Sequence, residues 1–191
     1  MKPDRLNAFT DGVLAVVITL MVLELKFPAE PSWKAVTEVL PLFIVYALSF
    51  VNVGIYWNNH HHMMQSVKRI GGPVLWANLF LLFWLSLFPL LIRWVGEAGV
   101  TTMPVVAFGT DLVLAALAYL ILERELIGVE GEQSAIAKAI GAKTKEWVSL
   151  AFYLAGVAIA FVDPWISVAL YVGVALVWFV PDRRFERGLQ Q

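Results

Sequence analysis

The chain has 191 residues, of which 60% are hydrophobic and 15% are charged. Soluble domains carry about 25% charged residues, so this composition excludes an ordinary water-soluble globule. A formal net charge of −1 without a basic block argues against a nucleic-acid-binding protein. The absence of cysteine excludes disulfides, thiolate metal sites and a cysteine nucleophile. The expected solvent for so apolar a chain is a lipid bilayer.

Charged residues separate six long apolar stretches, which predict an all-α membrane protein with six transmembrane helices. The expected spans cover about residues 4–27, 41–62, 73–92, 100–122, 147–162 and 165–180. Together they make residues 1–191 a single transmembrane domain. The last two spans flank Asp163-Pro164, a pair that ends a helix and predicts a tight hairpin turn. Pro89 is expected to kink the third span.

Basic residues are distributed unequally between the two sides of the membrane that six spans define. Eleven of the 14 fall on the side of the two termini, and only Lys26, Lys34 and Arg93 fall on the other. Because positively charged loops stay in the cytoplasm, the N- and C-termini are both expected there. The largest loop on that side, 123–146, has room for a short interfacial helix over 133–142.

The first span is unusual because it carries ionisable residues, which are costly in a bilayer and normally face a bundle interior or an aqueous path. At about 100° per residue, one narrow face collects a cation, an aromatic ring, a glycine and an apolar series with one hydroxyl group. These residues are Arg5, Phe9, Gly12, Val16, Thr19 and Leu23, with Leu20 beside them. Asp11 lies on roughly the opposite side and is expected to point into its own subunit.

Periodicity alone leaves two interpretations of this face open. It can be a helix-packing seam, because membrane interfaces favour small and hydroxylated residues such as Gly12 and Thr19. It can instead line a pore, if several copies of the chain surround one axis and Val16, Thr19 and Leu23 form stacked rings. The pattern does not choose between them.

The segment Arg5-Leu-Asn-Ala-Phe9-Thr10-Asp11 resembles the Arg-x-x-x-Phe-Ser-Asp signature that opens the transmembrane protein 175 family of potassium channels. The run from Trp57 to His62 is similar to the tryptophan- and histidine-rich end of that family's second span. Thr10 stands where serine is usual, which preserves the hydroxyl group. Prokaryotic members have about this length, six spans and cytoplasmic termini, so the resemblance implies a location in the inner (plasma) membrane.

The resemblance also implies a homotetramer whose first helices line a central potassium pore, without a Thr-Val-Gly-Tyr-Gly filter loop. Selectivity in that family is attributed to apolar rings on the first helix, with a threonine layer in prokaryotic members. By motif offset these positions are Val16, Thr19 and Leu23. Val16 stands where a larger Leu or Ile is typical, so we expect a wider ring there and a selectivity shifted toward Leu20 or Leu23.

The implied partners are further copies of the chain, the lipid bilayer and monovalent cations. No cofactor is implied, and K⁺ is the permeant ion. An enzyme is not expected, because the sequence shows no catalytic motif and no set of nucleophile and base.

Polar groups near the cytoplasmic ends of the first two spans predict a structural network. Arg5, Asp11, Trp57 and one of His60 and His61 are expected to fix the first helix, since a buried carboxylate needs a partner. A metal site at the three consecutive histidines is the alternative, but neighbouring helical side chains point about 100° apart and do not chelate one ion together. No metal is therefore expected. A protonation switch in these histidines is a further alternative.

Asp111 lies near the middle of the fourth span, where an acidic side chain is a functional candidate. Pairing with Asn78 or another polar group of a neighbouring helix is the expected arrangement. The alternative function is a proton-coupled secondary transporter that uses Asp11, Asp111 and the histidines. The chain lacks the internal repeats and the paired broken helices that mark many such transporters.

Overall fold

The computed structural model describes residues 3–26, 32–134, 136–137 and 143–179, and this part of the chain is helical without a β-strand. Helices lie in all six stretches that the charge pattern separates. The helices are α1 (Pro3–Leu23), α2 (Trp33–Gln65), α3 (Gly72–Leu85), α4 (Phe88–Ala98), α5 (Thr102–Glu130), α7 (Thr144–Ile159) and α8 (Pro164–Phe179).

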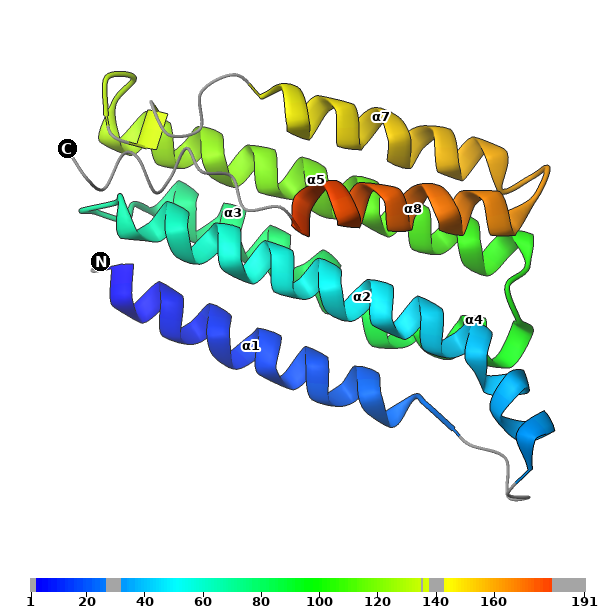
Figure 1. Ribbon diagram of the computed structural model, residues 1–191. Coiled ribbons are helices and arrows are strands. Elements are labelled where there is room, and N and C mark those ends of the chain that lie inside the picture. The colour runs from blue at the N-terminus through cyan, green and yellow to red at the C-terminus, as the bar shows by residue number, and fades with distance from the viewer. Residues whose placement is uncertain (1–2, 27–31, 135, 138–142, 180–191) are drawn as a thin grey trace.

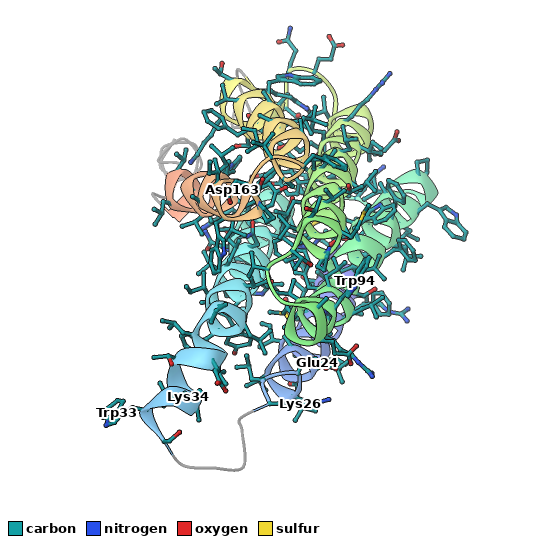
Figure 2. The ribbon with its side chains drawn as sticks, turned by 90° about the vertical axis from the view of Figure 1, so that its right-hand side faces the viewer. Glu24, Lys26, Trp33, Lys34, Trp94 and Asp163 are labelled. Atoms are coloured by element: carbon teal, nitrogen blue, oxygen red, sulfur yellow. The ribbon has the colours of Figure 1, made fainter. Side chains whose placement is uncertain are left out.

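The helices form one elongated bundle in which α1 and α7 lie on opposite sides (Figures 1 and 2). Helix α1 packs against α2, α3 and α4, and α7 packs against α5 and α8. The α7–α8 hairpin confirms the turn predicted at Asp163-Pro164. Asp163 Oδ1 accepts a hydrogen bond from the backbone N of Trp165 at 2.8 Å. Pro164 begins α8. A proline is well tolerated there, because the N–H that it lacks would make no hydrogen bond within the helix at this position.

Within residues 3–26, 32–134, 136–137 and 143–179, four helical segments are long and apolar enough to cross a bilayer: α1, α2, the joined α3 and α4, and α5. Helices α7 and α8 have 16 residues each. At 1.5 Å per residue each is about 24 Å long, which is somewhat less than the ~30 Å hydrocarbon core of a typical bilayer. Each of the two C-terminal helices is therefore shorter than the joined α3 and α4 and shorter than α1, α2 and α5.

The third apolar stretch is broken rather than kinked. Helix α3 ends at Leu85, four residues before Pro89, and α4 begins at Phe88. A proline has no N–H for the carbonyl four residues earlier, and its ring clashes with that carbonyl. The break at Leu85 follows directly from Pro89, and Ser86 donates its hydroxyl hydrogen to the Phe83 carbonyl at 2.7 Å across the end of α3.

Helix α2 begins at Trp33, eight residues earlier than the apolar run at 41 predicts. The Ser32 hydroxyl caps the helix by accepting a hydrogen bond from the backbone N of Ala35 at 3.1 Å. Lys34 and Glu38 form an exposed ion pair at 3.9 Å one turn further on. The charged residues that suggested a loop thus belong to a helical extension beyond the apolar run.

Helix α5 extends to Glu130, past the predicted end at 122. The Glu130 carboxylate accepts hydrogen bonds from the backbone N of Lys68 at 2.7 Å and of Arg69 at 3.1 Å, which ties α5 to the loop after α2. Helix α1 ends at Leu23, earlier than predicted. Residues 136–137 of the predicted interfacial helix are helical, whereas 135 and 138–142 lie outside the described residues.

The end of the bundle at which α1 terminates carries charged and aromatic side chains (Figure 2). Lys26 and Lys34, two of the three basic residues expected on one side of the membrane, both lie at this end. Such groups are typical of a membrane–water interface. The labelled residues there are Glu24, Lys26, Trp33, Lys34, Trp94 and Asp163.

Tyr171 of α8 is fully buried between α5 and α7, where two glycines make room for its ring. A Cβ atom added at Gly109 or at Gly156 would overlap the Tyr171 ring. Small residues at such contacts let membrane helices approach closely. These two glycines therefore fix how tightly α5, α7 and α8 pack.

We expect Gly156→Ala to destabilise the fold by about 1–3 kcal/mol, because the added methyl group displaces the Tyr171 ring in a filled core. The measurement is the midpoint of thermal unfolding of the purified protein in detergent. Gly173→Ala is the matched control, since no heavy atom lies within 4 Å of the added Cβ there. Equal midpoints for the two variants would contradict this packing.

Candidate functional site

The face of α1 that the periodicity singled out is not covered by the part of the chain that the structure describes. Val16 is 58% exposed and Leu23 is 67% exposed, and Phe9 and Leu20 are exposed with them. Met21, on the other side of the same helix, is completely buried. Helix α1 thus has one face packed into its own subunit and one face without a partner among the described residues of a single chain.

Two residues of this outward face are small or polar. At Gly12 no heavy atom of the described residues lies within 4 Å of the position that a Cβ would take, so the surface there is open. The Thr19 hydroxyl donates its hydrogen to the Ala15 carbonyl at 2.8 Å. Since a hydroxyl has one hydrogen and two acceptor lone pairs, the Thr19 oxygen remains available to water or to a cation.

Exposure alone does not separate a pore face from a lipid-facing one. Trp76, Phe83 and Leu176, on α3 and α8, are as exposed as the residues of α1, and they are large and apolar, as lipid contact requires. The α1 face differs because it combines apolar side chains with Gly12 and Thr19. Small and hydroxylated residues are typical of faces that meet another helix or water inside a membrane protein.

The inward face of α1 is held by a buried chain of hydrogen bonds. Thr10 is 1% exposed, and its hydroxyl oxygen accepts a hydrogen bond from Asn78 Nδ2 of α3 at 3.0 Å. The other amide atom, Asn78 Oδ1, lies 2.9 Å from His60 Nε2 of α2. This pairing requires the His60 proton on Nε2. One asparagine thereby joins α1, α2 and α3.

Asp11 makes a second connection between α1 and α2. Its Oδ1 accepts a hydrogen bond from the Trp57 indole N–H at 2.9 Å, so Asp11 contacts its own subunit as expected. The His61 ring stacks on Trp57 with centroids 6.0 Å apart and an interplanar angle of 22°. His61 Nε2 also lies 2.9 Å from Gln65 Nε2. Asp11, Trp57 and His61 therefore form a cluster beside the buried chain.

Two expected contacts do not form. Arg5 makes no hydrogen bond or ion pair with the described residues, so the structure does not place it in the predicted network. Asp111 is 4% exposed, and neither of its carboxylate oxygens has a hydrogen-bond partner in the described part of the chain. Asn78, its expected partner, is engaged by Thr10 and His60. The predicted pairing of Asp111 with Asn78 is wrong.

The three consecutive histidines contact different neighbouring residues. His60 contacts Asn78, His61 contacts Trp57 and Gln65, and the His61 and His62 rings meet edge to face at 5.9 Å. Within the described residues, no group of three or more His, Cys, Asp or Glu side chains is placed to hold a metal ion. The histidines therefore contribute here through packing and hydrogen bonds.

Comparison with known proteins gives matches to one family. Residues 5–89 match the family described as the endosomal/lysosomal potassium channel TMEM175. A protein named a potassium channel from Chryseobacterium sp. (strain P1-3) is 49% identical over 191 residues, which is 100% of both chains. A protein from Bos taurus named the endosomal/lysosomal proton channel TMEM175 is 31% identical over 86 residues, 39% of this chain and 18% of that one.

A solved structure shares the fold. It is the crystal structure of a lysosomal potassium-selective channel TMEM175 homologue from Chamaesiphon minutus, with a TM-score of 0.77 and 23% sequence identity. The match covers 93% of this chain and 96% of that one. With its apolar helices and its relatives named as channels, the chain is a membrane protein.

We expect Thr10→Val to lower the stability of the bundle by about 1–2 kcal/mol, because valine keeps the shape of threonine but leaves the Asn78 amide unpaired in an apolar interior. Thr10→Ser keeps the hydroxyl group and is expected to retain near-native stability. Thermal unfolding in detergent measures both. A Thr10→Val protein as stable as Thr10→Ser would show that the hydrogen bond does not anchor α1.

Proposed function

The chain belongs to the transmembrane protein 175 (TMEM175) family, and from this membership we propose that it is a passive, potassium-selective cation channel. Four copies, each a single domain with six spans, surround a central axis and turn the outward face of α1 toward it. The observation that carries this proposal is the unpartnered face of α1 with its mixed apolar and hydroxyl character. A fourfold arrangement gives that face a partner in every copy.

In the proposed pore, Val16 and Leu23 form apolar rings, with Leu20 at their side. A narrow apolar ring sheds water and therefore blocks ions until it widens, so such rings act as constriction and gate. Each ring receives one side chain from every copy. Because Val16 is small, the Leu23 ring is the tighter of the two in this proposal.

The Thr19 ring lies between the two apolar rings and supplies oxygen atoms. Each hydroxyl hydrogen is directed to the Ala15 carbonyl, which leaves the oxygen lone pairs to face the axis. Hydroxyl oxygens at this position replace part of the hydration shell of a dehydrating K⁺ ion. The proposed filter thus needs no carboxylate and no backbone loop.

The orientation completes the proposal. The N- and C-termini lie in the cytoplasm of a prokaryotic cell, and the channel resides in the inner membrane. The excess of basic residues on the side of the termini supports this orientation. No cofactor and no catalytic step take part, since an ion that moves down its gradient needs only a path.

A proton-coupled transporter is the second candidate. One observation favours it: Asp111 is buried, and its carboxylate has no hydrogen-bond partner among the described residues. Buried acidic side chains often serve proton relays. The other groups of that candidate are Asp11 and the histidines. Of these, Asp11 and His60 already make hydrogen bonds that hold helices together.

We expect purified protein in liposomes to pass K⁺ faster than Na⁺ without saturation, and Thr19→Ala to reduce the K⁺/Na⁺ flux ratio several-fold. Val16→Ala and Leu23→Ala are expected to raise the flux of both ions by widening an apolar ring. Leu176→Ala is the matched control, because Leu176 is equally exposed but lies on α8. Unchanged flux and selectivity in all three α1 variants would exclude this face as the pore.

Asp111→Asn separates the channel from the transporter. A channel with its pore on α1 is expected to keep its K⁺ flux within about twofold in this variant, since α5 does not contribute to the path. A proton-coupled transporter would lose K⁺ transport together with proton movement. Parallel recordings of K⁺ flux and of internal pH in the same liposomes distinguish the two.

A further inference from the structure

A pocket lies between α2, α5, α7 and α8, on helices other than α1. Its volume is about 40 Å³, which exceeds the ~10–15 Å³ that one water requires. The residues that characterise its wall are Asn52, Tyr56, Tyr119, Glu146, Tyr153 and Trp178. Glu146 near the start of α7 and Trp178 near the end of α8 both line the pocket. These two helix ends lie toward the end of the bundle where α1 begins (Figure 1).

Aromatic rings form most of the wall. Tyr56 of α2 and Tyr119 of α5 meet edge to face, with centroids 5.8 Å apart. Trp178 of α8 is held by a hydrogen bond from its indole N–H to Ser149 Oγ at 2.7 Å. The faces of such rings attract cations. The structure already shows this for Trp178, whose ring centroid lies 4.5 Å from Lys145 Nζ.

The charge of the wall is negative. Among the described residues, Glu146 is the one formally charged residue that lines the pocket. Its Oε2 atom is buried and accepts no hydrogen bond from the described residues. The nearby Lys143 is engaged by Glu123 at 3.0 Å and does not line the pocket. Lys145 also lies outside the lining, on the ring of Trp178.

Neutral acceptors and apolar contacts complete the wall. Asn52 Oδ1 accepts a hydrogen bond from the Tyr153 hydroxyl at 3.4 Å, which is long. This side-chain oxygen can therefore accept a shorter hydrogen bond from a ligand. Ile55 and Leu120 line the pocket beside these polar groups. A ligand that suits the wall carries a positive charge with several N–H donors and a short hydrocarbon part.

We propose that this pocket binds a small primary ammonium ion. The ammonium group donates a hydrogen bond to the buried Oε2 of Glu146. The alkyl part packs against Tyr56, Ile55 and Leu120. A bare K⁺ ion interacts with the Glu146 carboxylate but makes no apolar contacts. The pocket therefore binds an alkylammonium ion more tightly than K⁺. Two sources carry this chemistry: a free amine and the ethanolamine headgroup of a phospholipid. The proposal does not depend on the pore, because no residue of α1 takes part.

The test is equilibrium dialysis of radiolabelled methylammonium against the purified full-length protein in detergent, with Na⁺ as the background cation. Saturable binding of one methylammonium per chain is expected. Glu146→Gln should weaken it about tenfold, as expected for the loss of a hydrogen bond to a charged group. Glu132→Gln, an exposed acid in the loop after α5, is the matched control and should bind like the unaltered protein.

A second pair of variants keeps the test independent of the charge. Tyr56→Phe retains the ring surface against which the alkyl part lies and should preserve binding, whereas Tyr56→Ala removes that surface and should weaken binding several-fold. Binding that is absent, that survives Glu146→Gln, or that K⁺ displaces as well as ethylammonium does would overturn the proposal. The binding assay does not depend on ion flux. Its result therefore remains interpretable even if the channel proposal fails.

Reconstitution distinguishes the two sources of the ligand. Nanodiscs of phosphatidylethanolamine are compared with nanodiscs of phosphatidylglycerol, which has no amine. If methylammonium binds only in phosphatidylglycerol, the lipid headgroup competes for the pocket and is its occupant. Equal binding in both bilayers identifies a free amine as the ligand.

Discussion

The hydrogen-bonded chain from Thr10 through Asn78 to His60 determines how α1 sits in the bundle. In an apolar interior a hydroxyl group and an amide group need each other as hydrogen-bond partners, because no water is present to replace a lost partner. Thr10 therefore faces inward, and at 100° per residue Val16 then lies about 120° away around the helix. The rotation that satisfies Asn78 is the rotation that turns Val16, Thr19 and Leu23 outward.

This constraint divides the molecule into two regions. On one side, α1 presents a face that a single chain leaves without a partner, and the proposed fourfold assembly covers it. On the other side, α5, α7 and α8 are locked together by Tyr171 in contact with two glycines. The pocket lined by Glu146 lies between these three helices and α2 and shares no residue with α1. The proposed conduction and the proposed ligand binding thus involve different helices, which makes them separable by mutation.

The sequence predicts that each of the six apolar stretches is helical because charged residues separate these stretches, and it predicts the outward face of α1 because periodicity depends on one helix only. It misplaces the ends of α2 and α5, since a helix that continues past the apolar layer is as charged as a loop. The sequence pairs Asn78 with Asp111, whereas the structure shows Asn78 bonded to Thr10. The reason is that the rotation of one helix against its neighbours cannot be deduced from the residues of that helix alone. The pocket needs residues from four helices and has no local signal.

The most direct test of the account is cysteine accessibility on α1, which the absence of native cysteines makes free of background. A cysteine in place of Thr19 is treated with a permanently charged thiol reagent while K⁺ flux into liposomes is recorded, with Trp76→Cys on α3 as the lipid-facing comparison. The account predicts rapid loss of flux for Thr19→Cys and none for Trp76→Cys. Complete labelling of Thr19→Cys with undiminished flux would contradict it.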